Sequence, residues 1–227
     1  MKSELGGRMK GYAAISDLKL TPRSCVIIRV DGKNFHNYTK YCNKPFDNGI
    51  IDAMITATVE TAQQMQGFKL GYIQSDEASF LLTDFDKLTT QGWFNYEINK
   101  MVSISASYFT MLFNKSTLYG KVAVFDSRAF VVPKEDVPNY FVWRQQDWTR
   151  NSLQMLASSV FTHKELDGKG ATDMIEMLKE KGLSWSRLGE IYKNGTFITK
   201  DYEEFHQQWN YSDIEQQLWG WNGDVGQ

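Results

Sequence analysis

Hydrophobic residues follow strand-like spacing at two places early in the chain. An almost unbroken apolar run, residues 26–30, stops at Asp31 and Gly32. The β-branched residues in this run are typical of a central strand that is covered on both faces. Residues 68–83 contain two further apolar segments on either side of Ser75-Asp76-Glu77. This pattern predicts a hairpin whose turn carries two carboxylates.

Helix-like spacing separates these strands. After Asp47, a predicted N-cap, apolar residues recur at three- and four-residue intervals until a stop at Gly67, which predicts one amphipathic helix. A second apolar stripe predicts a helix that starts near residue 92 and reaches residue 112. Residues 122–125 predict a strand that ends at Asp126-Ser127-Arg128.

These elements follow the order β-α-β-β-α-β within residues 25–132, which is the order of a ferredoxin-like sheet and predicts an α+β fold. In that topology the first and third strands are adjacent and antiparallel, so Asp31 and Asp76 are expected to converge at one edge. A long apolar stripe then predicts a C-terminal helical extension. The expected domains are 1–24, an N-terminal arm; 25–132, the sheet; 133–200, the helical extension; and 201–227, an acidic tail with tryptophans.

Composition narrows the class of protein. The 227 residues are 42% hydrophobic and 14% aromatic, enough for a buried core. Apolar runs stay well below the roughly 18 residues of a membrane span, and residues 1–5 lack the apolar region of a signal peptide. We therefore expect a soluble, cytoplasmic protein with no membrane partner. Only Cys25, Cys42 and three histidines are present, which excludes a zinc site of known spacing.

Charge is unevenly distributed. The net charge is −2, yet residues 201–227 hold six acids and no Lys or Arg. Taking those six negative charges away leaves +4 on residues 1–200. A mildly basic body of this kind is compatible with phosphate ligands, whereas the overall balance argues against a general nucleic-acid coat.

The two acidic strand tips have a plain and a functional interpretation. Taken singly, Asp-Gly after a strand and Ser-Asp-Glu in a hairpin are usually turns in contact with solvent. Their expected convergence favours a joint function: Asp31, the Gly32 carbonyl and Asp76 supply the hard oxygen ligands that Mg²⁺ requires. A pair of Mg²⁺ ions about 3.5–4 Å apart clamps the attacking and leaving oxygens in phosphoryl or nucleotidyl transfer.

Five motifs in register resemble a known family. They are Asp31-Gly32-Lys33-Asn34-Phe35-His36, Lys44-Pro45 with Asp47, Gln74-Ser75-Asp76-Glu77 with Ser79-Phe80, Phe125-Asp126-Ser127-Arg128, and Trp143-Arg144-Gln145-Gln146-Asp147. In order and spacing they are similar to the tRNA-histidine guanylyltransferases and the related 3′-to-5′ RNA polymerases, across roughly residues 5–200.

The resemblance implies a palm domain of polymerase and nucleotidyl-cyclase type that works in the 3′-to-5′ direction. Family members activate the 5′ end of an RNA with ATP or GTP, and the 3′-hydroxyl of an incoming nucleoside triphosphate attacks that end. Carried over, Asp31 and Asp76 would be catalytic and, with Gly32, would hold two Mg²⁺ ions. The implied nucleotide-binding residues are Asp31, Gly32, Lys33, Asn34, Phe35, His36, Lys44, Ser75, Asp76, Glu77 and Lys100. The plain alternative is a solvated lysine at Lys44 or Lys100 and a packed histidine at His36.

The helical extension also resembles the family. Its polar residues would face tRNA or a tRNA-like RNA; they are Arg144, Gln145, Arg150, Asn151 and Lys193. Where untemplated enzymes carry His-Ile-Asn-Asn, this chain has Thr149-Arg150-Asn151-Ser152, which indicates the branch that adds templated nucleotides and repairs 5′ ends. Asn194 stands where a basic residue is common, which puts one RNA contact in doubt. The family resemblance further implies a homo-oligomer, a tetramer.

Three other functions remain as alternatives. Untemplated guanosine addition to histidine tRNA would need only a different selection of the incoming nucleotide. A nucleotidyl cyclase would share both aspartates, but it would not need the segment around Trp143 and Arg144. An RNA-recognition module has the same element order, but its third strand should carry stacking aromatics that Ser75-Asp76-Glu77-Ala78-Ser79-Phe80 does not provide. The polymerase hypothesis is therefore preferred.

Overall fold

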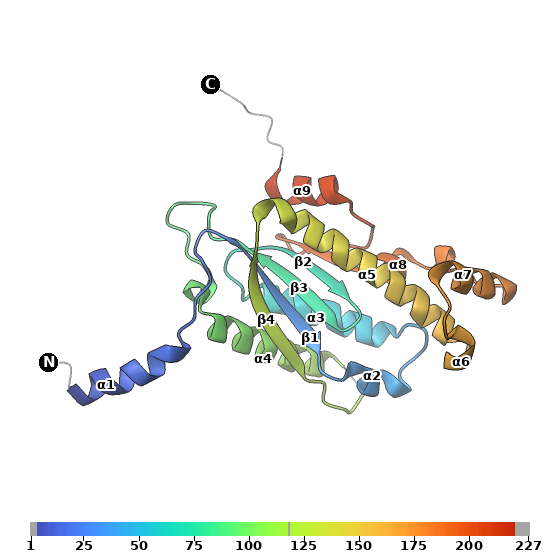
Figure 1. Ribbon diagram of the computed structural model, residues 1–227, viewed down its shortest axis with the longest axis horizontal. Coiled ribbons are helices and arrows are strands. Elements are labelled where there is room, and N and C mark those ends of the chain that lie inside the picture. Colours follow the sequence, from blue (N-terminus) through green and yellow to red (C-terminus); the bar gives the residue numbers. More distant parts are fainter. Residues whose placement is uncertain (1–3, 118, 221–227) are drawn as a thin grey trace, which may run out of the picture.

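A computed structural model describes residues 4–117 and 119–220, in which a twisted antiparallel sheet is covered by helices on both faces (Figure 1). The strands are β1 (Cys25–Gly32), β2 (Phe68–Gln74), β3 (Glu77–Leu82), β4 (Phe125–Val132), β5 (Thr196–Thr199) and β6 (Glu204–Phe205). The α-helices are α1 (Glu4–Ala13), α2 (Phe35–Tyr38), α3 (Asn48–Ala62), α4 (Ile98–Ser116), α5 (Val137–Ser158), α6 (His163–Leu166), α7 (Ala171–Glu180), α8 (Glu190–Asn194) and α9 (Tyr211–Trp219). Short 3₁₀ turns are η1 (Ala14–Ser16), η2 (Thr39–Tyr41), η3 (Trp93–Tyr96), η4 (Lys134–Asp136) and η5 (Trp185–Arg187).

The strand order is β4-β1-β3-β2-β5-β6, which contains the predicted ferredoxin-like arrangement and extends it by two strands. β1 lies between β4 and β3 and is antiparallel to both. Its register places Asp31 opposite Glu77 of β3 and Asp126 of β4. The α+β fold predicted from the pattern is confirmed, and the end of β1 lies beside the β2–β3 hairpin, as expected.

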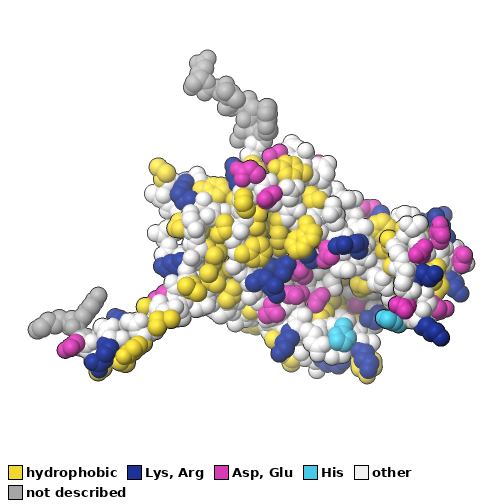
Figure 2. Space-filling model, viewed as in Figure 1, with side chains coloured by type: hydrophobic (Ala, Val, Ile, Leu, Met, Phe, Trp, Pro, Cys, Tyr) yellow, Lys and Arg dark blue, Asp and Glu magenta, His cyan; other side chains and the backbone are white. Residues whose placement is uncertain are grey.

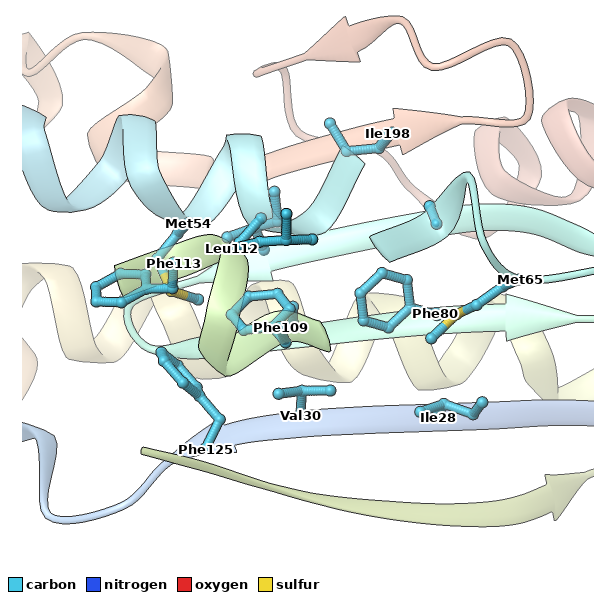
Figure 3. Close-up of a cluster of buried hydrophobic side chains, with 14 of the residues drawn as sticks. Ile28, Val30, Met54, Met65, Phe80, Phe109, Leu112, Phe113, Phe125 and Ile198 are labelled. Carbon is cyan, nitrogen blue, oxygen red and sulfur yellow. The ribbon is translucent and has the colours of Figure 1, made fainter. Parts of the chain in front are cut away.

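The larger core lies between the sheet and helices α3 and α4. Val30 of β1, Phe80 of β3, Phe109 of α4 and Phe125 of β4 are almost completely buried there and pack together (Figure 3). Met54 reaches the same cluster from α3. Alternation along β1 sends even-numbered residues 26–30 into this core. The odd-numbered residues of β1 therefore face the opposite layer.

Helices α5 and α9 cover that opposite face (Figure 1). Phe141 of α5 packs against Phe197 of β5, and Phe197 stacks on Trp209 with ring centroids 4.3 Å apart. Gln145 of α5 accepts a hydrogen bond from the Trp209 amide at 2.9 Å and donates one to the Trp209 carbonyl at 2.8 Å. The beginning of the acidic tail is thus part of the packed body.

The fourth strand differs from the sequence prediction. Residues 122–124 are not a strand, and β4 starts only at Phe125, so Asp126-Ser127-Arg128 lie inside a strand instead of ending one. The reason is local. The side-chain amide of Asn114 donates to the backbone carbonyl of Ala123 and accepts from the backbone N–H of Ala123, both at 2.8 Å. A side chain on α4 thereby occupies the backbone groups that a strand would need.

Two further predictions need correction. The second helix does not begin near residue 92, because Phe94 and Asn95 adopt positive φ inside η3 and α4 starts at Ile98. The segment 133–200 is not helical throughout, since β5 pairs with β2 in the sheet. Four residues of strand were too short a pattern to recognise between helices.

The two ends of the chain are less embedded. No residue of α1 is buried, and the helix projects from the body (Figure 1). In the tail, Trp219 packs near Phe85, while Trp221 lies outside the described residues, as do residues 1–3 of the N-terminal arm. Among residues 4–117 and 119–220, none of the helices has the combination of length and apolar character that a membrane crossing requires.

Candidate active site

The structure brings Asp31, Gly32 and Asp76 together. Asp31 and Gly32 are the last residues of β1, and Asp76 lies in the two-residue turn between β2 and β3. The Gly32 amide donates to the Asp76 carbonyl at 3.0 Å. A Cβ atom on residue 32 would lie 2.8 Å from Asp76 Oδ2 and 2.6 Å from the Phe35 ring. Only glycine fits this close approach, so the Asp-Gly dipeptide has a structural reason.

The electrostatics of this edge disfavour negative charge in the isolated protein. Burial raises the pKa of Asp31, and the neighbouring Asp126 raises it further, against the opposing guanidinium of Arg29. Burial also raises the pKa of Asp76; a hydrogen bond from Ser75 opposes the increase and the charge of Asp31 adds to it. A cation bound at this edge would offset the cost of keeping both carboxylates ionised.

The donor set fits hard divalent cations. Among the described residues there is no group of three or more His, Cys, Asp or Glu side chains that could hold a metal ion. The site instead has the carboxylates of Asp31 and Asp76 close to Gly32, whose carbonyl stays the third predicted ligand. Mg²⁺ is commonly held by one or two carboxylates and completes its shell with water and substrate phosphates, so this sparse set suits it.

The loop after β1 is only partly available to a ligand. The Lys33 amide donates to the Val124 carbonyl at 2.8 Å, so it is not free for a phosphate. Asn34 takes a left-handed conformation that turns the chain into α2. Phe35 is buried and stacks on Tyr38 with centroids 5.0 Å apart, which makes it mainly a core residue. The exposed side chain of His36 lines the cavity described next.

A cavity of about 410 Å³ opens beside Asp76. Its walls come from the segment 35–47, α3, the end of β2, α5 and α8. Ser75, Asp76 and His36 are its polar lining nearest the acidic edge, while Met54, Met155 and other apolar residues line the remainder. Lys44 also lines this cavity, and its ammonium donates to the Thr39 carbonyl at 3.2 Å. A phosphate-bearing ligand with an apolar ring system matches this division.

Aromatic side chains support one wall of the cavity. Phe46 stacks on Tyr192 with centroids 4.9 Å apart and contacts Trp148 at 6.3 Å. Below them, the predicted N-cap is confirmed: Asp47 accepts from the Ile50 amide at 3.2 Å. The sequence pattern did not single out Phe46, Trp148 or Tyr192 as site residues, because aromatic residues on a helical stripe are more often core.

Glu77 points away from this cavity. It lies on the α5 side of β3, where its carboxylate forms an ion pair with Arg144 at 2.8 Å and approaches Arg29 at 3.9 Å. Arg144 also pairs with Asp147 at 2.8 Å. Burial raises the pKa of Glu77, and both arginines oppose that increase. Glu77 and Arg144, predicted to contact nucleotide and RNA, are therefore held by each other.

Other predicted contacts are dispersed. Lys100 pairs with Glu97 at 2.9 Å in the first turn of α4. The part of α4 that lies near the site is three turns further along, where the Thr110 hydroxyl accepts a hydrogen bond from the Phe125 amide. Lys100 is thus not brought to the acidic edge. Gln145 cannot face RNA, because its amide is buried against Trp209.

Three polar residues of the predicted RNA set lie on helices outside the cavity. Arg150 and Asn151 are exposed on α5, and Arg150 pairs with Asp147 at 3.0 Å. Lys193 of α8 pairs with Glu190 at 2.7 Å. Ser152, next to them, is buried and accepts a hydrogen bond from Trp185 at 2.9 Å.

Known proteins resemble this chain in sequence. The sequence profile described as "Thg1: tRNAHis guanylyltransferase" matches residues 6–133. A curated relative, the tRNA(His) guanylyltransferase of Debaryomyces hansenii, is 29% identical over 87% of this chain and 82% of its own length. That of Candida glabrata is 30% identical over 82% of this chain and 87% of its own length.

A solved structure is similar over nearly the whole chain. A bacterial tRNA(His) guanylyltransferase (Thg1)-like protein in complex with ATP is 41% identical, with a TM-score of 0.90, and covers 95% of this chain and 100% of its own. The fold and the profile match, which covers more than half of the residues, agree. The chain belongs to the tRNAHis guanylyltransferase family, whose members are nucleotidyltransferases.

Proposed function

We propose that this protein adds nucleotides to the 5′ end of tRNA or a tRNA-like RNA in the 3′-to-5′ direction, with ATP or GTP activating that end and two Mg²⁺ ions assisting. Its role in the cell would be templated repair of 5′ ends in the cytoplasm. The observation that carries the proposal is the position of Asp76, which lines a cavity with an apolar interior and lies next to Gly32 and Asp31. The ATP complex of the bacterial Thg1-like protein, and a second one with GTP that is 37% identical, support nucleoside triphosphates as ligands.

The reaction has two balanced steps. In the first, an oxygen of the RNA 5′-phosphate attacks the α-phosphorus of ATP or GTP and pyrophosphate leaves. In the second, the 3′-hydroxyl of the incoming triphosphate attacks the activated 5′-phosphorus, a phosphodiester forms, and the nucleoside monophosphate leaves. Both steps transfer a phosphorus centre between oxygens, so a single acidic edge serves both.

Each residue of the edge has a separate task. Asp31, Asp76 and the Gly32 carbonyl would hold the cations, and Mg²⁺ bound there would neutralise charge on the reacting phosphates. Ser75 donates to Asp76 Oδ1 at 3.0 Å and fixes the orientation of that carboxylate. Lys44 places a positive charge at the cavity wall, where it attracts the triphosphate. Lys33, Asn34 and His36 border the path that the phosphates take.

The helical segment supplies the RNA side of the proposal. The palm, residues 25–132, would perform the chemistry, and residues 133–200 would carry the RNA on α5 and α8. Arg150 and Asn151 are exposed on α5 and suit phosphate contacts, which position an RNA without reading its sequence. Arg144 assists indirectly, since its pair with Glu77 joins α5 to the strand that follows Asp76.

Templated selection is supported by the segment at 149–152. Thr149 donates to the Gln145 carbonyl of its own helix at 3.1 Å, and Ser152 is buried against Trp185. Neither side chain is placed to read an incoming base. Base pairing with the opposite RNA strand would then make the selection.

The proposal includes a homo-oligomer, with a tetramer expected from the family resemblance. Leu5, Met9 and Tyr12 are exposed on α1. Figure 2 shows hydrophobic side chains along this projecting helix and over the β1 and β4 side of the sheet. Light scattering coupled to gel filtration distinguishes a tetramer from a monomer of 26.2 kDa.

The direct test is a 5′-extension assay. A tRNA that lacks its first nucleotide, carrying a 5′-monophosphate, is incubated with the protein, Mg²⁺, ATP and each nucleoside triphosphate in turn. We expect growth at the 5′ end, seen on a sequencing gel. Formation of a cyclic nucleotide without RNA extension would identify a cyclase instead, and no product of either kind would refute the proposal.

A further inference from the structure

The outer edge of β4 has no partner strand among the described residues. β4 lies at the end of the strand order and pairs with β1 on its inner side (Figure 3). Its eight residues are regular, with an unshifted register from Phe125 to Val132. An edge of this kind presents a row of backbone N–H and C=O groups, and it is a template for pairing with another chain unless it is short, bent or covered.

The register shows which backbone groups point outward. The Lys33 amide donates to the Val124 carbonyl at 2.8 Å, which continues the pairing of β1 with β4. Because backbone groups alternate between the two sides of an antiparallel strand, even-numbered residues of β4 bond to β1 and odd-numbered residues face outward. The Phe125 amide is already used, since it donates to the Thr110 hydroxyl at 3.1 Å. The groups open to another strand therefore begin at the Phe125 carbonyl and continue through residues 127–131.

The side chains beside this edge carry opposite charges. Asp126 and Arg128 lie two residues apart on one face of β4, and their side chains are 62% and 53% exposed. Their own contact is loose, with Arg128 Nη2 3.8 Å from Asp126 Oδ1. Charges of a single sign would repel a second copy of the chain, whereas an acid and a base spaced in this way can each meet the opposite charge.

Two-fold symmetry limits how this edge can pair with its own copy. Two-fold interfaces are the commonest in homo-oligomers, and they bring a strand edge to its copy in antiparallel direction. Outward-facing residues must oppose each other, so a residue of β4 lies on the axis. An axis at Asp126 or at Arg128 places like charges together, and an axis at Ala129 leaves both charges opposite apolar residues. Only an axis at Ser127 places each Asp126 opposite Arg128 of the second copy.

We propose that two copies of this protein pair through β4, antiparallel and with Ser127 on the two-fold axis, so that their sheets become continuous. The Ser127 residues exchange backbone hydrogen bonds on the axis, and each Ala129 amide donates to the Phe125 carbonyl of the second copy. Each Asp126 meets Arg128 of the other chain. This rests on the homo-oligomer in the proposed function and names the surface that forms it; a tetramer would contain two such pairs.

The same register covers an exposed apolar residue. Val124, which directly precedes β4, is 50% exposed. With Ser127 on the axis, Val124 lies opposite Phe130 of the second copy, on the face that carries the charges. The Phe130 ring is held in place by Tyr140, with ring centroids 5.9 Å apart. Burial of apolar surface at this contact favours association.

The first experiment reverses one charge at a time. Asp126→Arg and Arg128→Asp each create like-charged pairs across the axis, so each variant should self-associate at least about tenfold more weakly than the wild-type protein. An equimolar mixture of the two variants should form a mixed dimer with the wild-type dissociation constant, because every contact between positions 126 and 128 again joins Arg to Asp. Sedimentation over a dilution series measures the constants, and native mass spectrometry identifies the mixed dimer.

A matched control accompanies these variants. Glu176→Arg is a charge reversal of the same kind at an exposed residue of α7, away from β4. It should self-associate as the wild-type protein does.

The second experiment tests the backbone contact. Ser127→Pro removes the N–H on the axis, and proline is accepted at edge-strand positions whose N–H faces outward. It should weaken self-association at least about tenfold. Ser127→Ala is the control, because both variants lose the 2.7 Å hydrogen bond between the Ser127 and Ser105 hydroxyls, but alanine keeps the backbone N–H. Ser127→Ala should associate normally, and circular dichroism checks that both variants fold.

The outcomes distinguish this inference from the proposed function. Wild-type association of the charge-reversed variants or of Ser127→Pro would overturn the β4 pairing, as would failure of the mixture to form a mixed dimer; a homo-oligomer through another surface would stand. A wild-type protein that stays a monomer of 26.2 kDa would overturn both the pairing and the homo-oligomer. Self-association through β4 without 5′ extension of RNA would support the inference and refute the proposed nucleotidyl transfer.

Discussion

Arg144 of α5 is buried between two carboxylates, with Nε 2.8 Å from Oε1 of Glu77 and Nη2 2.8 Å from Oδ2 of Asp147. The first of these carboxylates follows Asp76 in the chain, and the second lies one helical turn from Arg144. This contact fixes α5 against the strand that begins at the proposed catalytic turn. A residue of the helical segment therefore stabilises the acidic edge without touching it.

The Glu77–Arg144 pair leads to the first prediction. Glu77→Leu should lower the free energy of unfolding by about 3 kcal/mol, because it leaves a buried guanidinium with only one partner. The double variant Glu77→Leu with Arg144→Met should lose clearly less than the two single losses combined. Urea unfolding of all four proteins measures this coupling. Arg150→Met, which removes an exposed guanidinium from the same helix, should change stability little, and additive losses at Glu77 and Arg144 would contradict the pairing.

The second prediction concerns the acidic pair. Asp31→Asn and Asp76→Asn should each abolish nucleotidyl transfer while retaining the fold, because each removes a cation ligand but keeps the side-chain volume. The 5′-extension assay measures the loss of nucleotidyl transfer, and circular dichroism checks that the fold is retained. Asp126→Asn is the matched control, since Asp126 lies opposite Asp31 on β4 but is exposed, and it should remain active. If either active-site variant turned over at the wild-type rate with Mg²⁺ as the only metal ion, Asp31 and Asp76 would not be the cation ligands.

The third prediction is that ATP protects the protein against heat only when Mg²⁺ is present. A ligand that binds only the native state raises stability by about 2.7 kcal/mol at a hundredfold excess over Kd. Thermal unfolding with ATP alone, Mg²⁺ alone and both together makes the comparison. Equal protection with and without the metal ion would place the nucleotide away from Asp31 and Asp76.

The fourth prediction concerns pH and the cap of α3. Burial opposes ionisation of Asp47, but hydrogen bonds from Tyr119 and from the amides of Asn43, Ile50 and Gly49 outweigh it and lower the pKa of Asp47. The pKa in the folded state is therefore below that in the unfolded chain. The stability that this carboxylate contributes is present above the unfolded pKa of about 3.9 and is lost as pH falls through the folded value.

Comparison with Asp47→Asn measures this contribution. The difference in unfolding free energy between the wild-type protein and the variant should be constant near neutral pH and should shrink below about pH 4. Tyr119→Phe, which removes one donor to Asp47, should reduce the difference. A difference that grows as the solution is acidified would mean that the carboxylate is not stabilised in its charged form.

The fifth prediction is template dependence. The base of the RNA opposite the growing 5′ end is changed through all four identities, and the added nucleotide is recorded. We expect it to follow the template, because Watson–Crick pairing discriminates, and because Thr149 and Ser152 are held by contacts within the helical segment. Guanosine addition at similar rates opposite every base would instead identify an untemplated histidine-tRNA enzyme.

The sequence by itself determined the four-stranded ferredoxin-like part of the sheet and the position of its acids. A buried β-branched strand that stops at Asp31 and a hairpin that carries Asp76 are local patterns, and the β-α-β-β-α-β order leaves few ways to connect them. The helix cap at Asp47 was equally visible, because an N-cap depends on its own turn. The family motifs added the chemistry of the edge.

Only the tertiary structure decided which polar residues line the cavity. Glu77 and Asp76 are adjacent in sequence, but strand alternation sends Glu77 towards Arg144 and leaves Asp76 at the cavity. Gln74 and Trp148 are 74 residues apart in the sequence, yet both line the same cavity because α5 crosses the end of β2. Periodicity records which face a residue occupies within its own element, while contacts between distant elements depend on packing that no local pattern encodes.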